Sequence, residues 1–186
     1  MNTPSTVIEA RERARRAGFG MSSEEEVGRL LAVLAGAVRP SGRILEIGTG
    51  SGAGLAWIVS GLGARTDAEV HSVELDPAIH ALAASATWPS WTTLHAGDVL
   101  TLLPTLGTFD LIFADAPGGK WTGLTATIAA LTPGGLLLVD DMTPPHWADD
   151  NHQTQTLRVR DTLLTHPSLT SVELACSTGL ILSTRR

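Results

Sequence analysis

The sequence predicts an α/β fold, built on a doubly wound, mostly parallel sheet with helices on both faces and an antiparallel strand toward its C-terminal end. Three observations support this prediction. From Arg43 onward, strand-like and helix-like runs alternate along the chain. The strand-like runs are continuously apolar, as expected of parallel strands that are buried on both faces. Five successive runs end in an acidic residue, which suits a ligand site at the carboxyl ends of parallel strands.

Two helices are expected before the sheet begins. The first covers 6–17 and ends at Gly18. The second covers 23–38, with Ser22 or Ser23 as its cap and three glutamates in its first turn, where acids suit the helix dipole. The apolar positions of the second helix have helical spacing, so we expect it to pack on the sheet.

The elements after these helices alternate regularly. We expect strands near 43–48, 69–74, 91–96, 109–114 and 135–140, separated by helices near 52–63, 77–87, 99–104 and 122–131. Short right-handed crossovers would join them. A polar loop then leads to a helix near 154–165, followed by strands at 170–175 and 179–184. The spacing of these two strands is typical of a hairpin, which predicts an antiparallel strand at the end of the sheet.

The acidic residues at the strand ends predict the kind of ligand. They are Glu46, Glu74, Asp98, Asp115, Asp140 and Asp141. Carboxylates accept hydrogen bonds and favour cations. We therefore expect a nucleoside-like ligand that carries hydroxyl groups and positive charge.

Composition limits the class of protein. The 186 residues carry a net charge of −6 without a basic and aromatic run, so nucleic acid is not an expected partner. The charge run RERARR at 11–16 is more typical of a solvated helix face than of an anion site. Cys176 is the single cysteine, which excludes an internal disulfide and suits a reducing compartment. No membrane span or signal-peptide pattern is present, so we expect one cytoplasmic domain without a membrane partner.

A glycine-rich loop follows the first strand of the sheet. Gly48, Gly50, Gly52 and Gly54 stand at every second position, where glycine allows sharp turns and close approach of a ligand. The loop also satisfies the dinucleotide fingerprint loosely, so a nicotinamide dehydrogenase is an alternative. Against it, Glu46 stands where a dinucleotide-binding strand is usually apolar, and no second domain for substrate follows.

Several motifs together resemble a known family. They are ILEIGTGSGAG, VELDP, GDVL, FDLIFADA, LTPGGLLLVDDM and SVELACSTGLILSTRR. In this order they resemble the class I S-adenosylmethionine-dependent methyltransferases, and most of all the small catechol O-methyltransferase-like group, from Met21 to the C-terminus. The resemblance implies a seven-stranded sheet and one methyltransferase domain over 1–186. In it, N-terminal helices at 1–40 would pack on or cover the site of an α/β core at 41–186.

The resemblance also implies a set of residues that bind S-adenosylmethionine. Glu74 would accept the two ribose hydroxyls, as its place after the second strand also suggests. Asp98 would lie beside the adenine amino group. Capping the next helix is its alternative role, and the two roles can coexist. Met21 would touch the cofactor or serve as a core contact where the second helix begins. The full set is Met21, Glu46, Gly48, Thr49, Gly50, Ser51, Gly52, Glu74, Leu75, Gly97, Asp98, Val99, Asp115 and Trp121.

A divalent cation such as Mg²⁺ is implied by the same resemblance, with Asp115, Asp140 and Asp141 as its ligands. The family usually has Asn as the third ligand, so Asp141 adds a negative charge. Asp115 and Lys120 are the catalytic candidates. The family's lysine would stand at the position of Gly118, and Lys120 either substitutes for it or is a solvent-exposed loop lysine, which the sequence slightly favours.

The function expected from this resemblance is O-methylation of a small acceptor, with phenols as a candidate class and a homodimer as a candidate assembly. Two alternatives stay open. One is a metal-independent methyltransferase in which Asp140 and Asp141 serve structure or orient the substrate. The other is a module that binds S-adenosylmethionine without catalysis. Trp147, in the polar loop, is a candidate cover for a flat substrate.

Overall fold

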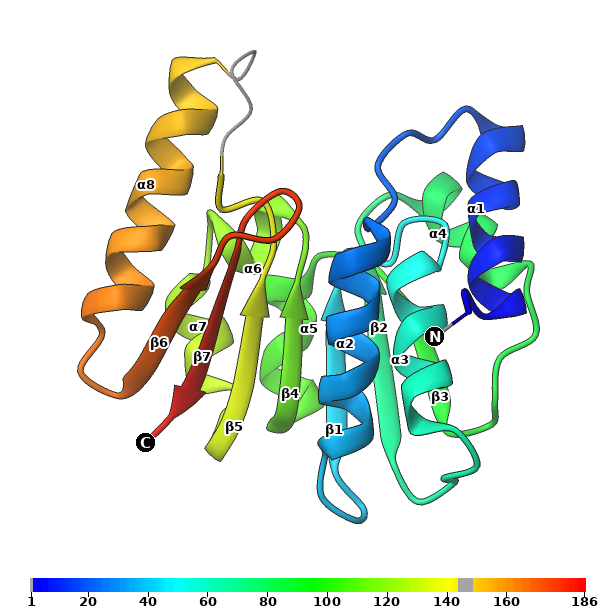
Figure 1. Cartoon of the computed structure of the whole chain (residues 1–186), viewed down its shortest axis with the longest axis horizontal. Coiled ribbons are helices and arrows are strands. Elements are labelled where there is room, and N and C mark those ends of the chain that lie inside the picture. The colour runs from blue at the N-terminus through cyan, green and yellow to red at the C-terminus, as the bar shows by residue number, and fades with distance from the viewer. Residues whose placement is uncertain (1, 144–148) are drawn as a thin grey trace.

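The predicted sheet is confirmed. The computed structural model describes residues 2–143 and 149–186. In this part of the chain, seven strands form one sheet in the order β3-β2-β1-β4-β5-β7-β6 (Figure 1). The strands are β1 (Arg43–Ile47), β2 (Glu69–Glu74), β3 (Thr92–Ala96), β4 (Phe109–Ala114), β5 (Leu131–Val139), β6 (Leu169–Leu174) and β7 (Leu180–Arg185). Strands β1 to β5 are parallel, and β7 lies antiparallel between β5 and β6.

The strand order places a ligand crevice beside β1. The chain runs outward from β1 to β2 and β3, and then returns to the other side of β1 as β4. At such a reversal, neighbouring connections diverge and leave a crevice at the carboxyl ends of the strands. The crevice is therefore expected at the ends of β1, β2 and β4.

Helices cover both faces of the sheet (Figure 1). The helices of the described residues are α1 (Ser5–Ala17), α2 (Glu25–Ala37), α3 (Ala53–Leu62), α4 (Pro77–Ala84), α5 (Val99–Leu106), α6 (Pro117–Lys120), α7 (Leu124–Ala129) and α8 (Asp150–Thr165). Side chains alternate along each strand, so Ile44 packs with α2 and α3, whereas Leu45 and Ile47 pack with α5, α7 and α8. None of the helices in the described residues is both long enough and apolar enough to cross a membrane.

The N-terminal helices lie close to the crevice. Helix α2 packs on α3, and α1 contacts both α3 and α4. The Arg13 guanidinium, on α1, donates a hydrogen bond to the carbonyl oxygen of Ser51 in the glycine loop, over 3.1 Å. The interpretation of 11–16 as a merely solvated face is therefore wrong for Arg13, because a carbonyl of the glycine loop lies within its reach.

Two predicted helix starts are also wrong. Helix α2 begins at Glu25, after Glu24, and no side chain caps it. The Ser23 hydroxyl instead donates to the carboxylate of Asp115, so a long-range partner replaces the local cap. Helix α8 begins at Asp150, four residues before the predicted start, because the Asp149 carboxylate accepts the backbone N–H of His152 and caps it.

Candidate functional site

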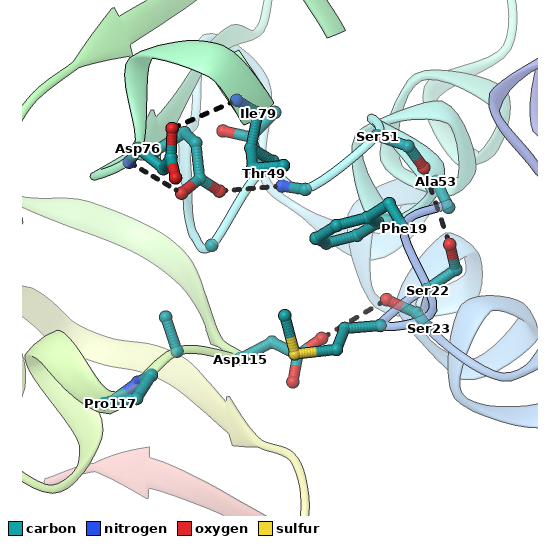
Figure 2. A pocket seen from close by; sticks show the side chains of 16 residues that line it. Phe19, Ser22, Ser23, Thr49, Ser51, Ala53, Asp76, Ile79, Asp115 and Pro117 are labelled. Atoms are coloured by element: carbon teal, nitrogen blue, oxygen red, sulfur yellow. Dashed lines mark hydrogen bonds between the residues drawn. The ribbon is translucent and has the colours of Figure 1, made fainter. Parts of the chain in front are cut away.

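A pocket of about 240 Å³ opens at the carboxyl ends of β1, β2 and β4. Figure 2 shows Phe19, Ser22 and Ser23, from the segment between α1 and α2, on one side of it, with Asp76 and Ile79 on another. Seven predicted site residues line the pocket: Met21, Gly48, Thr49, Gly50, Ser51, Glu74 and Asp115. Nine further residues line the pocket and were not among the predicted cofactor-binding residues: Phe19, Ser22, Ser23, Ala53, Gly54, Asp76, Ile79, Ala116 and Pro117.

The glycine loop has a backbone that side chains would distort. Gly48, Gly50 and Gly52 have φ values of 100°, 54° and 89°. The N–H groups of Gly48 and Thr49 both donate to the carbonyl oxygen of Val73, which ties the loop to β2. A side chain on Gly50 would meet the Phe19 ring at 3.1 Å, inside the pocket. The loop thus leaves its backbone open to a ligand that approaches closely.

Gly52 faces away from this ligand space. A Cβ atom on Gly52 would lie 2.9 Å from the Trp88 ring and 3.3 Å from the Arg13 guanidinium. Gly52 is needed for packing of the loop against α1, and it is absent from the pocket lining.

Two backbone N–H groups orient the Glu74 carboxylate. One oxygen accepts the N–H of Gly50 at 2.9 Å, and the other accepts the N–H of Asp76 at 3.1 Å. A carboxylate has about four acceptor positions, so roughly two of them stay available to a ligand. Glu74 therefore presents a pair of acceptors whose direction the backbone fixes.

Glu46 lies beneath the glycine loop, not in the pocket. Its side chain is buried, with 1% exposure, and accepts a hydrogen bond of 2.5 Å from the Ser72 hydroxyl, which also bonds Thr49. Gly54 makes room for it, since a Cβ atom there would stand 2.2 Å from a Glu46 oxygen. Burial, with smaller contributions from the Asp115 and Glu74 carboxylates, raises the pKa of Glu46 to about 8.

A lysine and three aspartates gather beside the pocket. The Lys120 side chain is 3% exposed. Its Nζ donates to the backbone carbonyl of Asp140 and to the Asp141 carboxylate, each over 3.1 Å. Burial and the neighbouring carboxylates raise the pKa of Asp115, and burial raises that of Asp140. The slightly favoured interpretation of Lys120 as a solvent-exposed loop lysine is wrong, because the side chain turns inward to these acids.

The described donor set does not fit a divalent cation. No group of three or more His, Cys, Asp or Glu side chains among the described residues is arranged to hold a metal ion. One Asp140 oxygen already accepts the Asp141 N–H and the Thr178 hydroxyl, at 2.7 and 2.5 Å. The carboxylate of Asp141 is paired with the Lys120 ammonium, and that of Asp115 accepts from Ser23 at 3.4 Å.

The remaining predicted site residues lie outside the pocket lining. Asp98 caps α5 by accepting the Leu100 N–H, as its alternative interpretation predicted. Val99 is buried in the core, and Gly97 donates its N–H to the carbonyl of Glu74. Trp121 packs on the core with its ring edge-on to a histidine of α8.

Two exposed apolar side chains stand at the pocket edge. Met21 lines the pocket and is 79% exposed, so the alternative of a core contact is wrong for it. Leu75 is 69% exposed and lies between the lining residues Glu74 and Asp76. Large apolar groups exposed next to a pocket are available for contact with a ligand. Trp147 falls outside the described residues.

Known proteins resemble this chain in sequence and in structure. A family model described as a methyltransferase domain matches residues 45–142, more than half of the chain. A curated protein of Mycolicibacterium vanbaalenii, named "Putative O-methyltransferase", is 33% identical over 141 residues, which are 72% of this chain and 61% of that protein. The chain thus spans less than two thirds of that relative's length.

Two solved structures share the fold. The cofactor-bound protein Rv0187 from MTB has a TM-score of 0.84 and 25% identity, over 98% of this chain and 90% of that one. The O-methyltransferase TomG from Streptomyces achromogenes, in complex with SAM, has a TM-score of 0.79 and 23% identity, over 99% of this chain and 91% of that one. The fold predicted from the sequence therefore recurs in both proteins.

Proposed function

Because the chain belongs to the methyltransferase domain family, as its motifs predicted, we propose that it transfers a methyl group from S-adenosylmethionine to an oxygen of a small molecule. The observation that carries this proposal is the pocket at the ends of β1, β2 and β4, with the glycine loop on one side and Glu74 held by two backbone N–H groups. We further propose that 1–186 works as one domain, with the helices of 1–40 contributing to the site.

The residues present fit this cofactor. Glu74 would accept the ribose hydroxyls with the acceptor positions that Gly50 and Asp76 leave available. The glycine loop, from Gly48 to Ser51, would hold the methionine part, and a Cβ atom on Gly50 would fill that space. Leu75 and Met21 would add apolar contacts at the pocket edge. Asp98 would reach the adenine only if the ligand extends beyond the present lining.

The bound cofactor would supply a methyl group on a positively charged sulfur. An acceptor oxygen would receive that methyl group from the sulfur and would give up its proton to a base or to water. The protein's part is to align the acceptor and to stabilise charge. Asp115 is the proposed catalytic group, because its carboxylate lies both in the pocket lining and in the acidic cluster.

The resemblance to catechol O-methyltransferases implies a divalent cation, but the proposed methyl transfer does not depend on one. The bonds that Asp140 and Asp141 make within the chain compete with metal ligation. The acceptor is proposed to be a small molecule, with phenols as the first class to test. A cytoplasmic location is supported by the single Cys176, and a homodimer stays a prediction.

Two measurements test the proposed function. Calorimetry of the purified protein should show binding of S-adenosylmethionine and S-adenosylhomocysteine but not of NAD. Turnover of cofactor labelled in its methyl group should then appear with one or more members of a panel of phenols and other small hydroxylated acceptors. Binding of NAD without a response to either sulfur compound would overturn the assignment. Cofactor binding without turnover on a broad panel would favour the non-catalytic module.

A further inference from the structure

We propose that the Lys120 ammonium occupies the place of a divalent cation at the acidic cluster of Asp115, Asp140 and Asp141, so that the site carries a cation of its own and needs no added metal. The turnover part of this inference rests on the proposed methyltransferase function. The part that concerns metal binding does not rest on that function, because it states only which cation the acidic cluster holds in the free protein.

The position of Lys120 is the first support. A buried ammonium must be paired and hydrogen-bonded, because removing it from water is costly. Lys120 meets this requirement with the Asp140 carbonyl and the Asp141 carboxylate. The third carboxylate, on Asp115, also interacts with Lys120 electrostatically. The ammonium thus bonds to Asp140 and Asp141 and interacts electrostatically with Asp115, the three residues that were predicted to ligate the metal.

The loop that carries Lys120 holds it in this inward direction. The Gly119 N–H donates to the carbonyl of Thr122 at 2.7 Å, and the Gly119 carbonyl accepts the Thr127 hydroxyl at 2.8 Å. Gly119 has φ 81°, and a Cβ atom there would stand 2.8 Å from the Ile47 side chain. This tight turn is packed on β1, so the inward position of Lys120 belongs to the fold.

The backbone conformation of Asp141 directs its carboxylate to the lysine. It is one of three described non-glycine residues with positive φ, at 60°, in a conformation that costs free energy for an L residue. From this position, its carboxylate pairs with Lys120 while its N–H bonds the Asp140 carboxylate. Asp141 therefore completes a network around the ammonium.

The residue type supports the same conclusion. Lys120 is the single lysine of the sequence, and the other twelve basic residues counted with it are arginines. An ammonium is a compact point charge, whereas a guanidinium is a flat fork. A divalent cation close enough to ligate the same carboxylates would stand within a few ångströms of the ammonium and be repelled by it. The two cations are therefore alternatives.

Manganese binding tests this inference directly. After treatment with a chelator, the wild-type protein should bind no Mn²⁺ in electron paramagnetic resonance titrations up to about 1 mM. Lys120→Met keeps an unbranched chain but removes the charge, so it should bind Mn²⁺ at concentrations at least about tenfold below that limit. Lys120→Arg keeps a cation and is the matched control, which should gain no site. Tight Mn²⁺ binding by the wild type, or no gain in a folded Lys120→Met protein, would overturn the proposal.

The single lysine also provides a readout on the unchanged protein. Labelling with ¹⁵N-lysine gives one side-chain ammonium signal, which should be slowed in exchange by its buried bonds and should persist when Mn²⁺ is added. Loss of that signal at low Mn²⁺ concentrations would place the metal beside Lys120 and would contradict the proposal. This test needs only the wild-type protein, so it holds even if the variants do not fold. Once an acceptor is known, chelated wild-type protein should keep its turnover. Calorimetry with the cofactor distinguishes the two proposals. Metal binding by a wild-type protein that also binds the cofactor contradicts only the role of Lys120, whereas a lack of cofactor binding contradicts the proposed function.

Discussion

Glu74→Gln preserves the shape of the side chain and removes its charge. In the structure, the two carboxylate oxygens accept one backbone N–H each, from Gly50 and Asp76. Gln has only one acceptor oxygen, so its NH₂ group must face an N–H donor and one ribose hydroxyl of the proposed ligand. A hydrogen bond to a charged group contributes about 1.5–3 kcal/mol. The loss of one such bond should weaken cofactor binding by roughly 10- to 150-fold.

The assay is titration calorimetry of S-adenosylhomocysteine against both proteins at equal ionic strength. Glu69→Gln is the matched control, because it makes the same change at the opposite end of β2, where Glu69 pairs with Arg43 outside the pocket lining. The control should bind within about twofold of the wild type. Unchanged affinity in a folded Glu74→Gln protein would refute the proposed role of Glu74.

Three further predictions concern the loop and its supports. Gly50→Val should fold but show no cofactor binding by calorimetry, because Gly50 has φ 54° and a side chain would enter the pocket; retained affinity would contradict this. The raised pKa of Glu46, about 8 against an ordinary 4.5, means that the folded state holds the proton more tightly. The contribution of Glu46 to the free energy of unfolding is thus full below pH 4.5, falls by up to a few kcal/mol as the pH rises to 8, and is then constant. Thermal unfolding of Glu46→Gln should therefore show a smaller loss of stability between pH 4.5 and pH 8 than the wild type. Arg13→Met should lower the free energy of unfolding, measured with denaturant, by about 1 kcal/mol and should weaken cofactor binding, because the bond to Ser51 is lost. The control Arg16→Met, on the same helix, should change the free energy of unfolding by under about 0.5 kcal/mol.

The sequence determined the sheet and the edge at which the pocket lies. Continuous apolar runs alternating with helical ones specify parallel strands, because both faces of such strands must be covered. The carboxyl ends of parallel strands share one edge, so acidic residues at the ends of successive runs were expected near that edge. Glu74 and Asp115 could therefore be placed in the pocket from their positions alone.

The tertiary structure decided which of these side chains face the ligand. Glu46 follows the same pattern as Glu74, yet it turns under the loop, because alternation along β1 directs it toward α3, where Gly54 makes room. Local pattern could not show this, since Gly54 lies eight residues away and its packing role depends on how α3 crosses the strand.

Lys120, Ser23 and Arg13 were misplaced for a related reason. Each is a polar residue, and its segment shows either no strong hydrophobic periodicity or the ordinary periodicity of a surface helix. Polar side chains in such segments are usually exposed to solvent. Their partners lie 20 or more residues away in the sequence: Asp140 and Asp141 for Lys120, Asp115 for Ser23, and Ser51 for Arg13. Sequence patterns report the burial of apolar faces, whereas the pairing of a single polar group depends on the distance between atoms that only the folded chain brings together.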